Sequence, residues 1–280
     1  MRQTVLPQLA DVEAVCDAAC ALVRELLTQP LDSRNKADQS PVTAIDLAID
    51  AFLHQKLRPL MPSAGWLSEE TADQPDRLDN PWLWVVDPID GTRSLIAGKP
   101  EFCVSIALVN SGIGPMLGVI GNPSTAERWS AERGHGARNQ LGQLLRVREA
   151  IPNDYIDLLV SRSDARLGLW DDVAGNGAFR RVGSLAYKMA LVAAGQCDGH
   201  ATPTPRSEWD AAAGDLLISE AGGMTADAHG RPLRFNQPRP QFDGFVVASR
   251  AAFPTVLELA RSASRRWQQL AQVAPGARRP

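Results

Sequence analysis

The sequence has few residues of the kinds that build disulfide scaffolds or zinc sites. Only four cysteines and four histidines occur in 280 residues. Cys16 and Cys20 lie four residues apart on one face of an expected helix, too far apart for an easy disulfide, and no paired Cys or His motif accompanies them. We therefore expect buried, reduced thiols, and histidines that are structural or exposed.

The chain also lacks an excess of charge of either sign and any long apolar run. Its net charge of −3 and pI of about 5.8 give no reason to expect binding to a nucleic acid polymer or to an anionic membrane. Met1–Thr4 is followed by Asp11 and Glu13 rather than by an apolar segment, and no run approaches the length of a membrane span. These absences favour a cytoplasmic protein that does not bind membranes.

An apolar strand that ends in two carboxylates is the most informative feature that is present. Residues 82–86 form a continuous apolar run, as in a buried strand. Pro88 cannot extend a ladder of strand hydrogen bonds, so the chain is expected to leave the sheet at Asp87 and bend. Asp87, the Ile89 carbonyl and Asp90 would then converge on one point. Such an all-oxygen environment is the one that Mg²⁺ prefers.

The turn after this strand suits an anion. Gly91 and Thr92 are expected to begin a helix, and the free backbone N–H groups at a helix start can bind phosphate. Metal and phosphate would then lie side by side. Taken alone, residues 87–91 are equally well explained as a surface turn, because Asp, Pro and Gly dominate turns for local reasons.

Three further segments place acids where expected elements begin or end. Gly65-Trp66-Leu67 is a short apolar approach to the acids of Ser68-Glu69-Glu70. Asp46 stands at the head of one amphipathic helix, and Asp210 lies in the first turn of another. Taken singly, Asp46 and Asp210 are also explained as charges that favour a helix start.

Together, the four segments closely resemble the inositol monophosphatase superfamily of Mg²⁺-dependent, lithium-sensitive phosphomonoesterases. The motifs of that family read D-x-S-P-V-T-x-x-D, G-x-x-S-E-E, W-x-x-D-P-[IL]-D-G-T and W-D-x-A-A-G, and all four occur here in that order. Gly183-Ser184 resembles a fifth signature on the substrate side, which makes Ser184 a candidate substrate contact. The resemblance implies an α+β fold, namely a layered α-β-α-β-α sandwich with the active site between two subdomains, and a homodimer.

We expect the chain to divide at the polar run that ends near residue 150. Residues 1–150 would form an α+β subdomain with most metal ligands, residues 151–262 an α/β subdomain that completes the site, and residues 263–280 a frayed basic tail. The pattern predicts helices over 4–28, 46–60, 164–174, 184–195, 209–221 and 252–262, and strands over 64–68, 82–87, 102–109, 115–121, 128–131, 156–161, 179–182 and 244–248.

The resemblance implies a metal-binding role for five positions. Glu69, Asp87 and the Ile89 carbonyl would hold a first Mg²⁺, and Asp87, Asp90 and Asp210 a second, with Asp87 as the bridge. Glu69 would also hold water on a weaker third ion, which gives two to three Mg²⁺ per active site. Divalent ions are needed because an anionic phosphate ester repels an oxygen nucleophile.

The resemblance implies catalytic and phosphate-binding roles for the residues around these ligands. Asp46 and Thr92 would orient and deprotonate the attacking water, with the catalytic Glu69 close by. The backbone amides of Gly91 and Thr92 would bind phosphate oxygens. For Glu70, a supporting role beside the site and simple exposure both remain open.

The preferred substrate follows less directly. Inositol-specific members carry a Glu seven residues before the W-D aspartate, where this chain has Pro203. Residues 204–210 look more like bacterial 3′(2′),5′-bisphosphate nucleotidases, which hydrolyse 3′-phosphoadenosine 5′-phosphate to AMP during sulfate assimilation. A second phosphate needs a cation away from the metals, and Arg206 is the candidate. For Arg93 and Lys188 we favour solvated side chains.

Other functions remain open beside this one. Inositol phosphate, histidinol phosphate or a sugar phosphate would be alternative substrates for a phosphatase of the same superfamily. A non-catalytic binding protein on the same scaffold is a third hypothesis, and the presence of every expected ligand argues against it. In each case the partner is a small-molecule phosphate ester.

Overall fold

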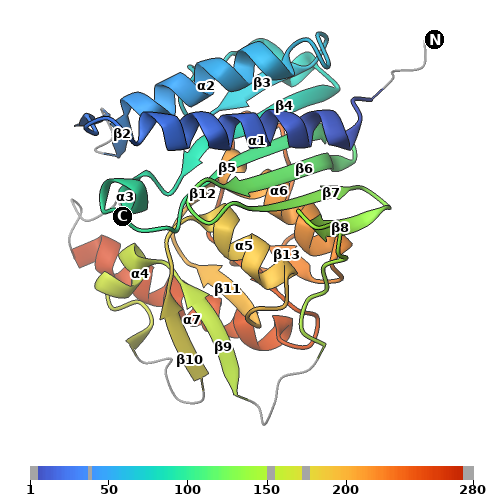
Figure 1. Ribbon diagram of the computed structural model, residues 1–280. Coiled ribbons are helices and arrows are strands. Elements are labelled where there is room, and N and C mark those ends of the chain that lie inside the picture. Colours follow the sequence, from blue (N-terminus) through green and yellow to red (C-terminus); the bar gives the residue numbers. More distant parts are fainter. Residues whose placement is uncertain (1–5, 37–39, 150–154, 172–176, 274–280) are drawn as a thin grey trace.

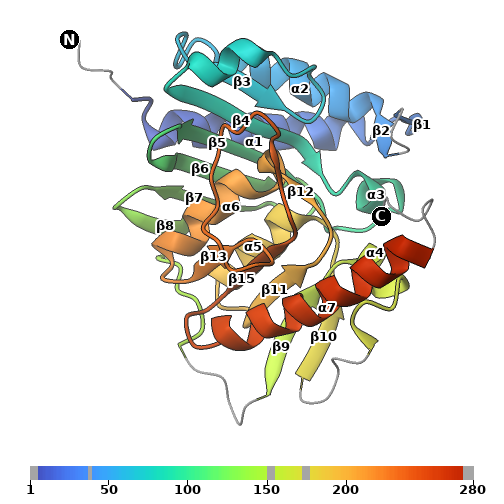
Figure 2. The same cartoon turned by 180° about the vertical axis from the view of Figure 1, so that it is seen from behind.

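The structure is a computed structural model that describes residues 6–36, 40–149, 155–171 and 177–273. Helices and sheets alternate in layers across the molecule (Figures 1 and 2). From one face to the other, the layers are α1 with α2, a six-stranded sheet, α5 with α6, a five-stranded sheet, and α7. The expected α-β-α-β-α sandwich is therefore confirmed.

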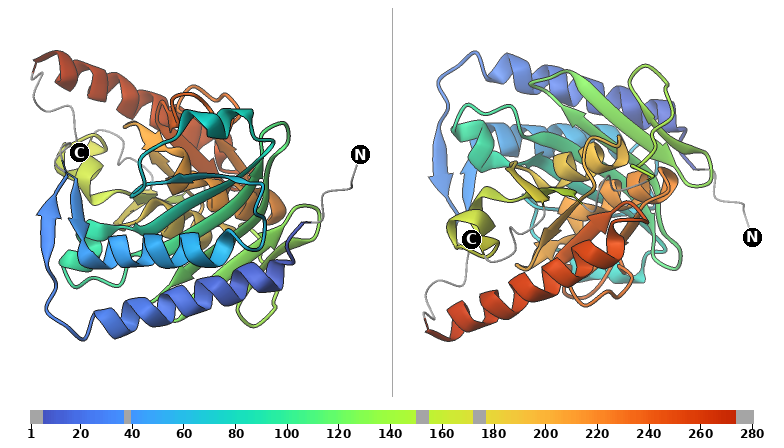
Figure 3. Two further views of the ribbon diagram at one scale, coloured as in Figure 1. Left: turned by 90° about the horizontal axis from the view of Figure 1, so that it is seen from above. Right: turned by 90° about the horizontal axis from the view of Figure 1, so that it is seen from below.

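The outer helical layer packs on the first sheet through apolar faces. Helices α1 (Leu9–Leu26) and α2 (Ala44–Leu57) lie side by side over the sheet, as Figure 3 shows from above. Each helix buries apolar side chains at helical spacing, which are Val12, Cys16, Ala19 and Val23 on α1 and Ile49, Leu53 and Leu57 on α2. All four cysteines are buried and free, as expected from their spacing.

The six-stranded sheet runs in the order β3-β4-β5-β6-β7-β8. Strands β3 and β4 are parallel, and every other neighbouring pair is antiparallel. Its members are β3 (Gly65–Ser68), β4 (Trp82–Asp90), β5 (Cys103–Asn110), β6 (Gly114–Asn122), β7 (Glu127–Glu132) and β8 (Gly136–Asn139). The parallel pair matters for the site because both strands end at the same edge, which places Glu69 and Asp87 next to each other.

The middle layer consists of α5 (Leu185–Ala193) and α6 (Glu208–Glu220). These helices approach closely because α6 carries only small residues at positions 211–214. A Cβ on Gly214 would come within 2.5 Å of the Met189 sulfur on α5. The tight contact fixes the start of α6, and hence Asp210, relative to the start of α5.

The five-stranded sheet runs in the order β10-β9-β11-β15-β13 and is covered on its outer face by α7 (Phe253–Val273). Strands β10, β9 and β11 are parallel, whereas β15 is antiparallel to β11 and to β13. Their bounds are β9 (Ile156–Val160), β10 (Gly177–Arg181), β11 (Gly199–Thr202), β13 (Met224–Ala226) and β15 (Phe245–Ala248).

Short elements complete the described chain. They are the pair β1 (Ser33–Asn35) and β2 (Pro41–Thr43), the 3₁₀ helix η1 (Pro75–Asp79), α3 (Thr92–Ile96), α4 (Arg162–Arg166), and the pair β12 (Arg206–Ser207) and β14 (Gln241–Phe242).

Most predicted elements are confirmed within a few residues, but two predictions were wrong. The helix predicted over 252–262 continues to Val273, so residues 263–273 are not a frayed tail. Ala263 is buried and Trp267 packs on the core of the second sheet, which explains the continuation. Helix α4 is also shorter than predicted. The proposed boundary after residue 150, residues 172–174 and the last seven residues lie outside the described part of the chain.

Candidate active site

The end of β4 bends without leaving the sheet. Asp87 pairs with Ser105 and Asp90 pairs with Cys103, so three steps along β4 match two along β5. The prediction that pairing stops at Asp87 was therefore wrong. A β-bulge between Asp87 and Asp90 adds one extra residue to β4, so the strand continues past Pro88. In a regular strand, residues three apart point to opposite faces. The bulge allows Asp87 and Asp90 to turn toward the same point.

The start of α6 brings a third carboxylate to this point. Ligand atoms of Asp87, Asp90 and Asp210 all lie within 4.8 Å of one another. Burial is the main reason that the pKa of Asp87 is raised well above its ordinary range, and burial followed by the neighbouring Asp90 and Glu69 carboxylates raises the pKa of Asp210 to about 7. Asp87 Oδ2 is buried and has no hydrogen-bond partner among the described residues. A hard cation fits this site, because it would supply the missing partner and offset the repulsion among the acids.

The start of α5 fixes Asp90. Its Oδ2 atom accepts hydrogen bonds from Ser184 Oγ at 2.7 Å and from the Ala186 amide at 2.5 Å. Ser184, which we expected to contact substrate, therefore also binds a candidate metal ligand. Both donors come from the second half of the chain, so Asp90 joins the two halves across the site.

The predicted catalytic pair Asp46 and Thr92 is in direct contact. Thr92 Oγ1 donates to Asp46 Oδ1 at 2.8 Å and also lies 3.1 Å from the Ile89 carbonyl oxygen. The other carboxylate oxygen of Asp46 accepts from Thr43 Oγ1 and from the Thr43 amide, at 2.5 and 2.8 Å. This is the capping box of α2, so the motif D-x-S-P-V-T-x-x-D uses its last acid for the helix start and for the site at once.

Glu69 does not belong to the cluster of three carboxylates. Its Oε1 accepts from Lys36 Nζ at 2.9 Å, and Lys36 also binds Glu70 at 2.6 Å. Glu70 has only 5% of its side chain exposed, which favours the supporting role over simple exposure, and burial raises its pKa to about 7. Lys36 lies 33 residues before Glu69, just outside the D-x-S-P-V-T-x-x-D motif, and the sequence motifs gave no signal for this contact.

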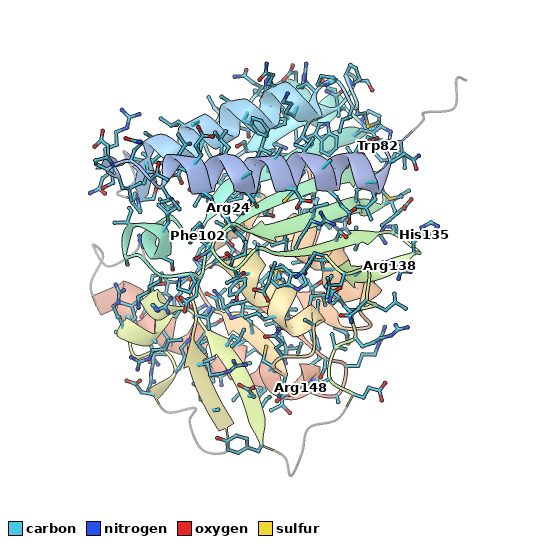
Figure 4. All side chains as sticks on the ribbon, viewed as in Figure 1. Arg24, Trp82, Phe102, His135, Arg138 and Arg148 are labelled. Carbon is cyan, nitrogen blue, oxygen red and sulfur yellow. The ribbon has the colours of Figure 1, made fainter. Side chains whose placement is uncertain are left out.

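Gly91 makes the turn between β4 and α3. Its φ of 100° is in the left-handed region that favours glycine. A Cβ at this position would come within 2.8 Å of the Glu101 carbonyl oxygen and 3.2 Å of Phe102 Cα. Figure 4 shows Phe102 on the side of the molecule where α3 lies, whereas His135 and Arg138 lie on the opposite side. Glycine is therefore required at this turn both by its backbone angle and by the close packing of residues 101 and 102.

A cavity of about 310 Å³ lies over these residues. Glu69, Ile89, Asp90, Gly91, Thr92, Ser184 and Asp210 line it, together with the basic side chains of Arg93, Lys99, Arg162, Arg166, Lys188 and Arg206. The predicted site residues are thus gathered at one place, with Asp46 and Asp87 beneath its wall. The wall formed by α3, α4 and the segment before α6 is rich in positive charge, which sequence patterns did not reveal for Lys99, Arg162 and Arg166.

Arg206 lines the cavity but is not a free charge. Its Nη2 donates to Thr202 Oγ1 at 3.1 Å and lies 3.6 Å from Asp164 Oδ1. Asp164 is fully buried, and Thr202 Oγ1 in turn donates to it at 2.6 Å. This network fixes the guanidinium at the cavity wall.

Lys188 corrects one prediction. We favoured a solvated side chain, but Lys188 is only 2% exposed, and burial lowers the pKa of its ammonium to about 8. Its Nζ donates to main-chain carbonyl groups of the segment before α5. Arg93, the other cation for which we favoured solvation, is exposed at the rim.

Comparison with known proteins agrees with this geometry. Residues 8–265 match the inositol monophosphatase family. The chain belongs to this family. It is accordingly a phosphomonoester hydrolase from a metal-dependent family that acts on small phosphate esters. The family and the enzyme class predicted from the four motifs are therefore confirmed.

Relatives within the family carry two different activities in their names. The 3′(2′),5′-bisphosphate nucleotidase CysQ of Shigella flexneri is 37% identical over 228 residues, which cover 79% of this chain and 90% of the relative. The inositol-1-monophosphatase of Rhizobium meliloti (strain 1021) is 34% identical over 240 residues, which cover 79% of this chain and 86% of the relative. Sequence similarity alone does not choose between these substrates.

Solved structures of the family share the fold. An IMPase of Thermotoga maritima has a TM-score of 0.80 and 25% identity, over 90% of this chain and 96% of its own. The inositol monophosphatase of Anabaena (Nostoc) sp. PCC 7120 has a TM-score of 0.73 and 26% identity, over 92% and 95%. Within the described residues, no helix combines the length and the apolar character that crossing a membrane requires.

Proposed function

We propose that the protein is a 3′(2′),5′-bisphosphate nucleotidase that hydrolyses 3′-phosphoadenosine 5′-phosphate to AMP and phosphate. The observation that carries the proposal is the basic wall of the cavity, on which Arg206 is fixed by Thr202 and Asp164 rather than by the three clustered acids. A substrate with one phosphate has its charge neutralised at the metal site and makes no use of this wall, where Arg162 and Arg206 are already paired with Glu101 and Asp164. A second phosphate would use it, since guanidinium groups bind phosphate well.

Two further observations support this substrate. The relative from Shigella flexneri is named for this activity. The position at which inositol-specific members carry a Glu is Pro203, which has no polar side-chain atom to contact an inositol hydroxyl.

The acids at the cavity floor would hold Mg²⁺. Asp87, Asp90 and Asp210 would together hold one ion. Asp87, the Ile89 carbonyl and Glu69 would hold another, once Glu69 leaves Lys36. Two to three ions per active site are proposed from the family resemblance. When bound, Mg²⁺ supplies charge neutralisation, activation of water and stabilisation of the leaving oxygen.

The chain's own residues would position water and phosphate. Thr92 Oγ1 donates its proton to Asp46, so its oxygen can accept a hydrogen bond from the attacking water, and Asp46 can take up the proton that the water releases. The phosphorus–O3′ bond breaks as the bond from the water oxygen to phosphorus forms, and O3′ takes a proton from solvent. The amides of Gly91 and Thr92 and the side chain of Ser184 would contact the substrate, and the catalytic role of Glu69 would be to hold water nearby.

The second candidate is an inositol-1-monophosphatase, which the relative from Rhizobium meliloti favours. The decisive experiment compares kcat/KM for 3′-phosphoadenosine 5′-phosphate, adenosine 3′-monophosphate and inositol 1-phosphate in excess Mg²⁺. Adenosine 3′-monophosphate is the matched control, because it has the same leaving group without the 5′-phosphate. We expect the bisphosphate to be preferred by roughly ten- to a hundredfold over this control, as a charge-assisted contact predicts. Faster turnover of inositol 1-phosphate would overturn the proposal.

A homodimer and a cytoplasmic location are proposed as well, from the family resemblance and from the sequence. Light scattering during size-exclusion chromatography would test the first, with a mass of twice 30.2 kDa as the expected result. Fractionation of cells that express the protein would test the second.

A further inference from the structure

Lys188 is a buried ammonium group whose hydrogen bonds within the described residues go to main-chain carbonyls, although the nearby carboxylates of Asp90 and Asp164 act to raise its pKa, which burial lowers. It is 2% exposed and lies in the first turns of α5. Its Nζ lies 2.6 Å from the carbonyl oxygen of Ser184, 3.3 Å from that of Val182 and 3.4 Å from that of Gly183. Among the described residues it forms no salt bridge within 4.0 Å. An ammonium has three donors, and here all three are directed at consecutive main-chain carbonyls.

These three carbonyls belong to a turn that the backbone does not favour by itself. Ser184 has a φ of 55°, which is a strained value for a residue with a Cβ. Gly183 is packed so closely that a Cβ would come within 2.0 Å of Ser94 Oγ, and its amide is held by Glu101 at 3.0 Å. Carbonyl oxygens that converge repel one another, and the ammonium of Lys188 offsets that repulsion.

The turn held by Lys188 presents two donors to one carboxylate. Ser184 Oγ and the Ala186 amide both donate to Asp90 Oδ2, at 2.7 and 2.5 Å. Ser184 Oγ is itself oriented, because it accepts from the Tyr187 amide at 3.0 Å. The direction of the Asp90 side chain in the acid cluster therefore depends on the conformation of residues 182–184.

We propose that Lys188 is a positioning residue for metal binding. It stabilises the strained turn before α5, the turn aims Ser184 Oγ and the Ala186 amide at Asp90, and Asp90 is thereby held ready for the ion that it shares with Asp87 and Asp210. The proposal rests on the metal site of the proposed function and does not depend on which phosphate ester is the substrate.

A simpler alternative is that Lys188 acts by its charge alone. A cation near Asp90 would favour the carboxylate form at any conformation of the turn, and it would also repel a metal ion. On that alternative, removing the charge improves metal binding or leaves it unchanged. If Lys188 is a positioning residue, removing its ammonium group weakens metal binding, and the weakening depends on the presence of the Ser184 hydroxyl.

The experiment measures the dissociation constant of Mg²⁺ by titration calorimetry without substrate. The variants are Lys188→Met, Lys188→Gln, Ser184→Ala and the double variant Lys188→Met/Ser184→Ala. The matched control is Lys56→Met, because Lys56 lies on the outer helix α2 over the Phe52 ring. Thermal unfolding with EDTA reports whether each variant is folded.

We expect Lys188→Met and Ser184→Ala each to raise the Mg²⁺ dissociation constant by about tenfold, as is usual when a group that orients a metal ligand is removed. The double variant should bind Mg²⁺ no more weakly than the single variant with the lower affinity, because both changes interrupt the same chain of contacts. Lys188→Gln keeps a donor for the turn and should retain part of the affinity even if Lys188→Met fails to fold. Lys56→Met should bind as the wild type does.

Three results would overturn the inference. One is an unchanged or tighter dissociation constant in both Lys188 variants, and another is a double variant whose loss is the product of the two single losses. A wild-type enzyme that does not bind Mg²⁺ would overturn the proposed metal site as well, which distinguishes the failure of the proposed function from the failure of this inference.

Discussion

Two clusters of largely buried charged side chains meet the first turn of α6, and they are built in opposite ways. The acid cluster consists of Asp87, Asp90 and Asp210. The other, which we call the arginine cluster, consists of Asp73, Arg77, Glu208, Asn236 and the main chain of Gln237. Glu208 and Asp210 are only two residues apart, so the same helix start serves both clusters.

In the arginine cluster, every charge has partners within the chain. Arg77 is 2% exposed and binds Asp73 through Nε and Nη2 at 2.5 and 2.9 Å, Asn236 Oδ1 at 2.7 Å and the Gln237 carbonyl at 2.9 Å. Glu208 accepts from the amides of Asn236 and Gln237, at 2.7 and 2.8 Å. In the acid cluster, three like charges meet, and within the described part of the chain Asp87 Oδ2 has no hydrogen-bond partner. The comparison teaches that buried charges paired within the chain support the fold, whereas a buried carboxylate that meets other carboxylates without a partner is a place for a cation.

The largest effect is expected from a substitution in the acid cluster. Asp90→Asn should lower turnover by roughly a thousandfold or more, because it removes a charge that the proposed metal site requires. The fold should remain, and with EDTA the melting temperature should be equal or higher, since one of three repelling charges is gone. Activity and melting temperature are measured on the same preparation. Activity within tenfold of the wild type would contradict the metal assignment.

The second largest effect is expected from a substitution in the arginine cluster. Arg77→Met should lower the free energy of unfolding by roughly 3 kcal/mol, because the buried Asn236 side chain and the part-buried Gln237 carbonyl lose their donor. Well below the melting temperature, turnover per folded molecule should stay within a few-fold of the wild type. Chemical denaturation with activity assays at low temperature tests both parts. A loss of turnover without a loss of stability would show that this cluster is part of the site.

A third and smaller effect concerns the basic wall beyond the acid cluster. Arg206→Ala should lower kcat/KM for 3′-phosphoadenosine 5′-phosphate by roughly ten- to a hundredfold and barely change it for adenosine 3′-monophosphate. Arg206 also offsets buried Asp164, so the melting temperature is measured in parallel. Arg231→Ala, an exposed arginine that does not line the cavity, is the control. Equal losses on both substrates would indicate general damage to the cavity.

The smallest expected effect is a dependence of the melting temperature on pH, to which one acid of each cluster contributes. Burial raises the pKa of Asp210 and of Glu208 to about 7, above the values near 4 of an unfolded chain. Such groups favour the folded state below the unfolded pKa, and this contribution is lost as the pH rises through the folded pKa. With EDTA, the melting temperature should therefore fall by a few degrees between pH 5.5 and pH 8.

Addition of Mg²⁺ should raise the melting temperature more at pH 8 than at pH 5.5, because a metal ion competes with protons for the same carboxylates. Differential scanning fluorimetry in matched buffers measures both trends. A melting temperature that rises from pH 5.5 to pH 8 with EDTA would contradict the proposed sign. Arg77→Met should leave the response to Mg²⁺ intact, whereas Asp90→Asn should remove most of it.

The sequence by itself determined the elements that carry the site and most of the residues in it. The apolar run of β4, the Asp46 capping box and the acid in the first turn of α6 are encoded within about ten residues each, so local patterns were sufficient. The four motifs then predicted the family and the layered fold. The assigned roles of the individual site residues stay predictions until the variants are measured.

Only the tertiary structure decided which partners these residues have. Lys36 binds Glu69 from 33 residues away, Ser184 binds Asp90 from 94 residues away, and Asn236 binds Arg77 from 159 residues away. Lys188 was predicted to be solvated because a lysine in isolation is most stable in water, and it is buried because its own helix carries it beneath a turn of converging carbonyls. The contacts of Lys36, Ser184 and Asn236 depend on how distant segments pack together, and no local pattern in a chain encodes a partner that lies so far away in the sequence.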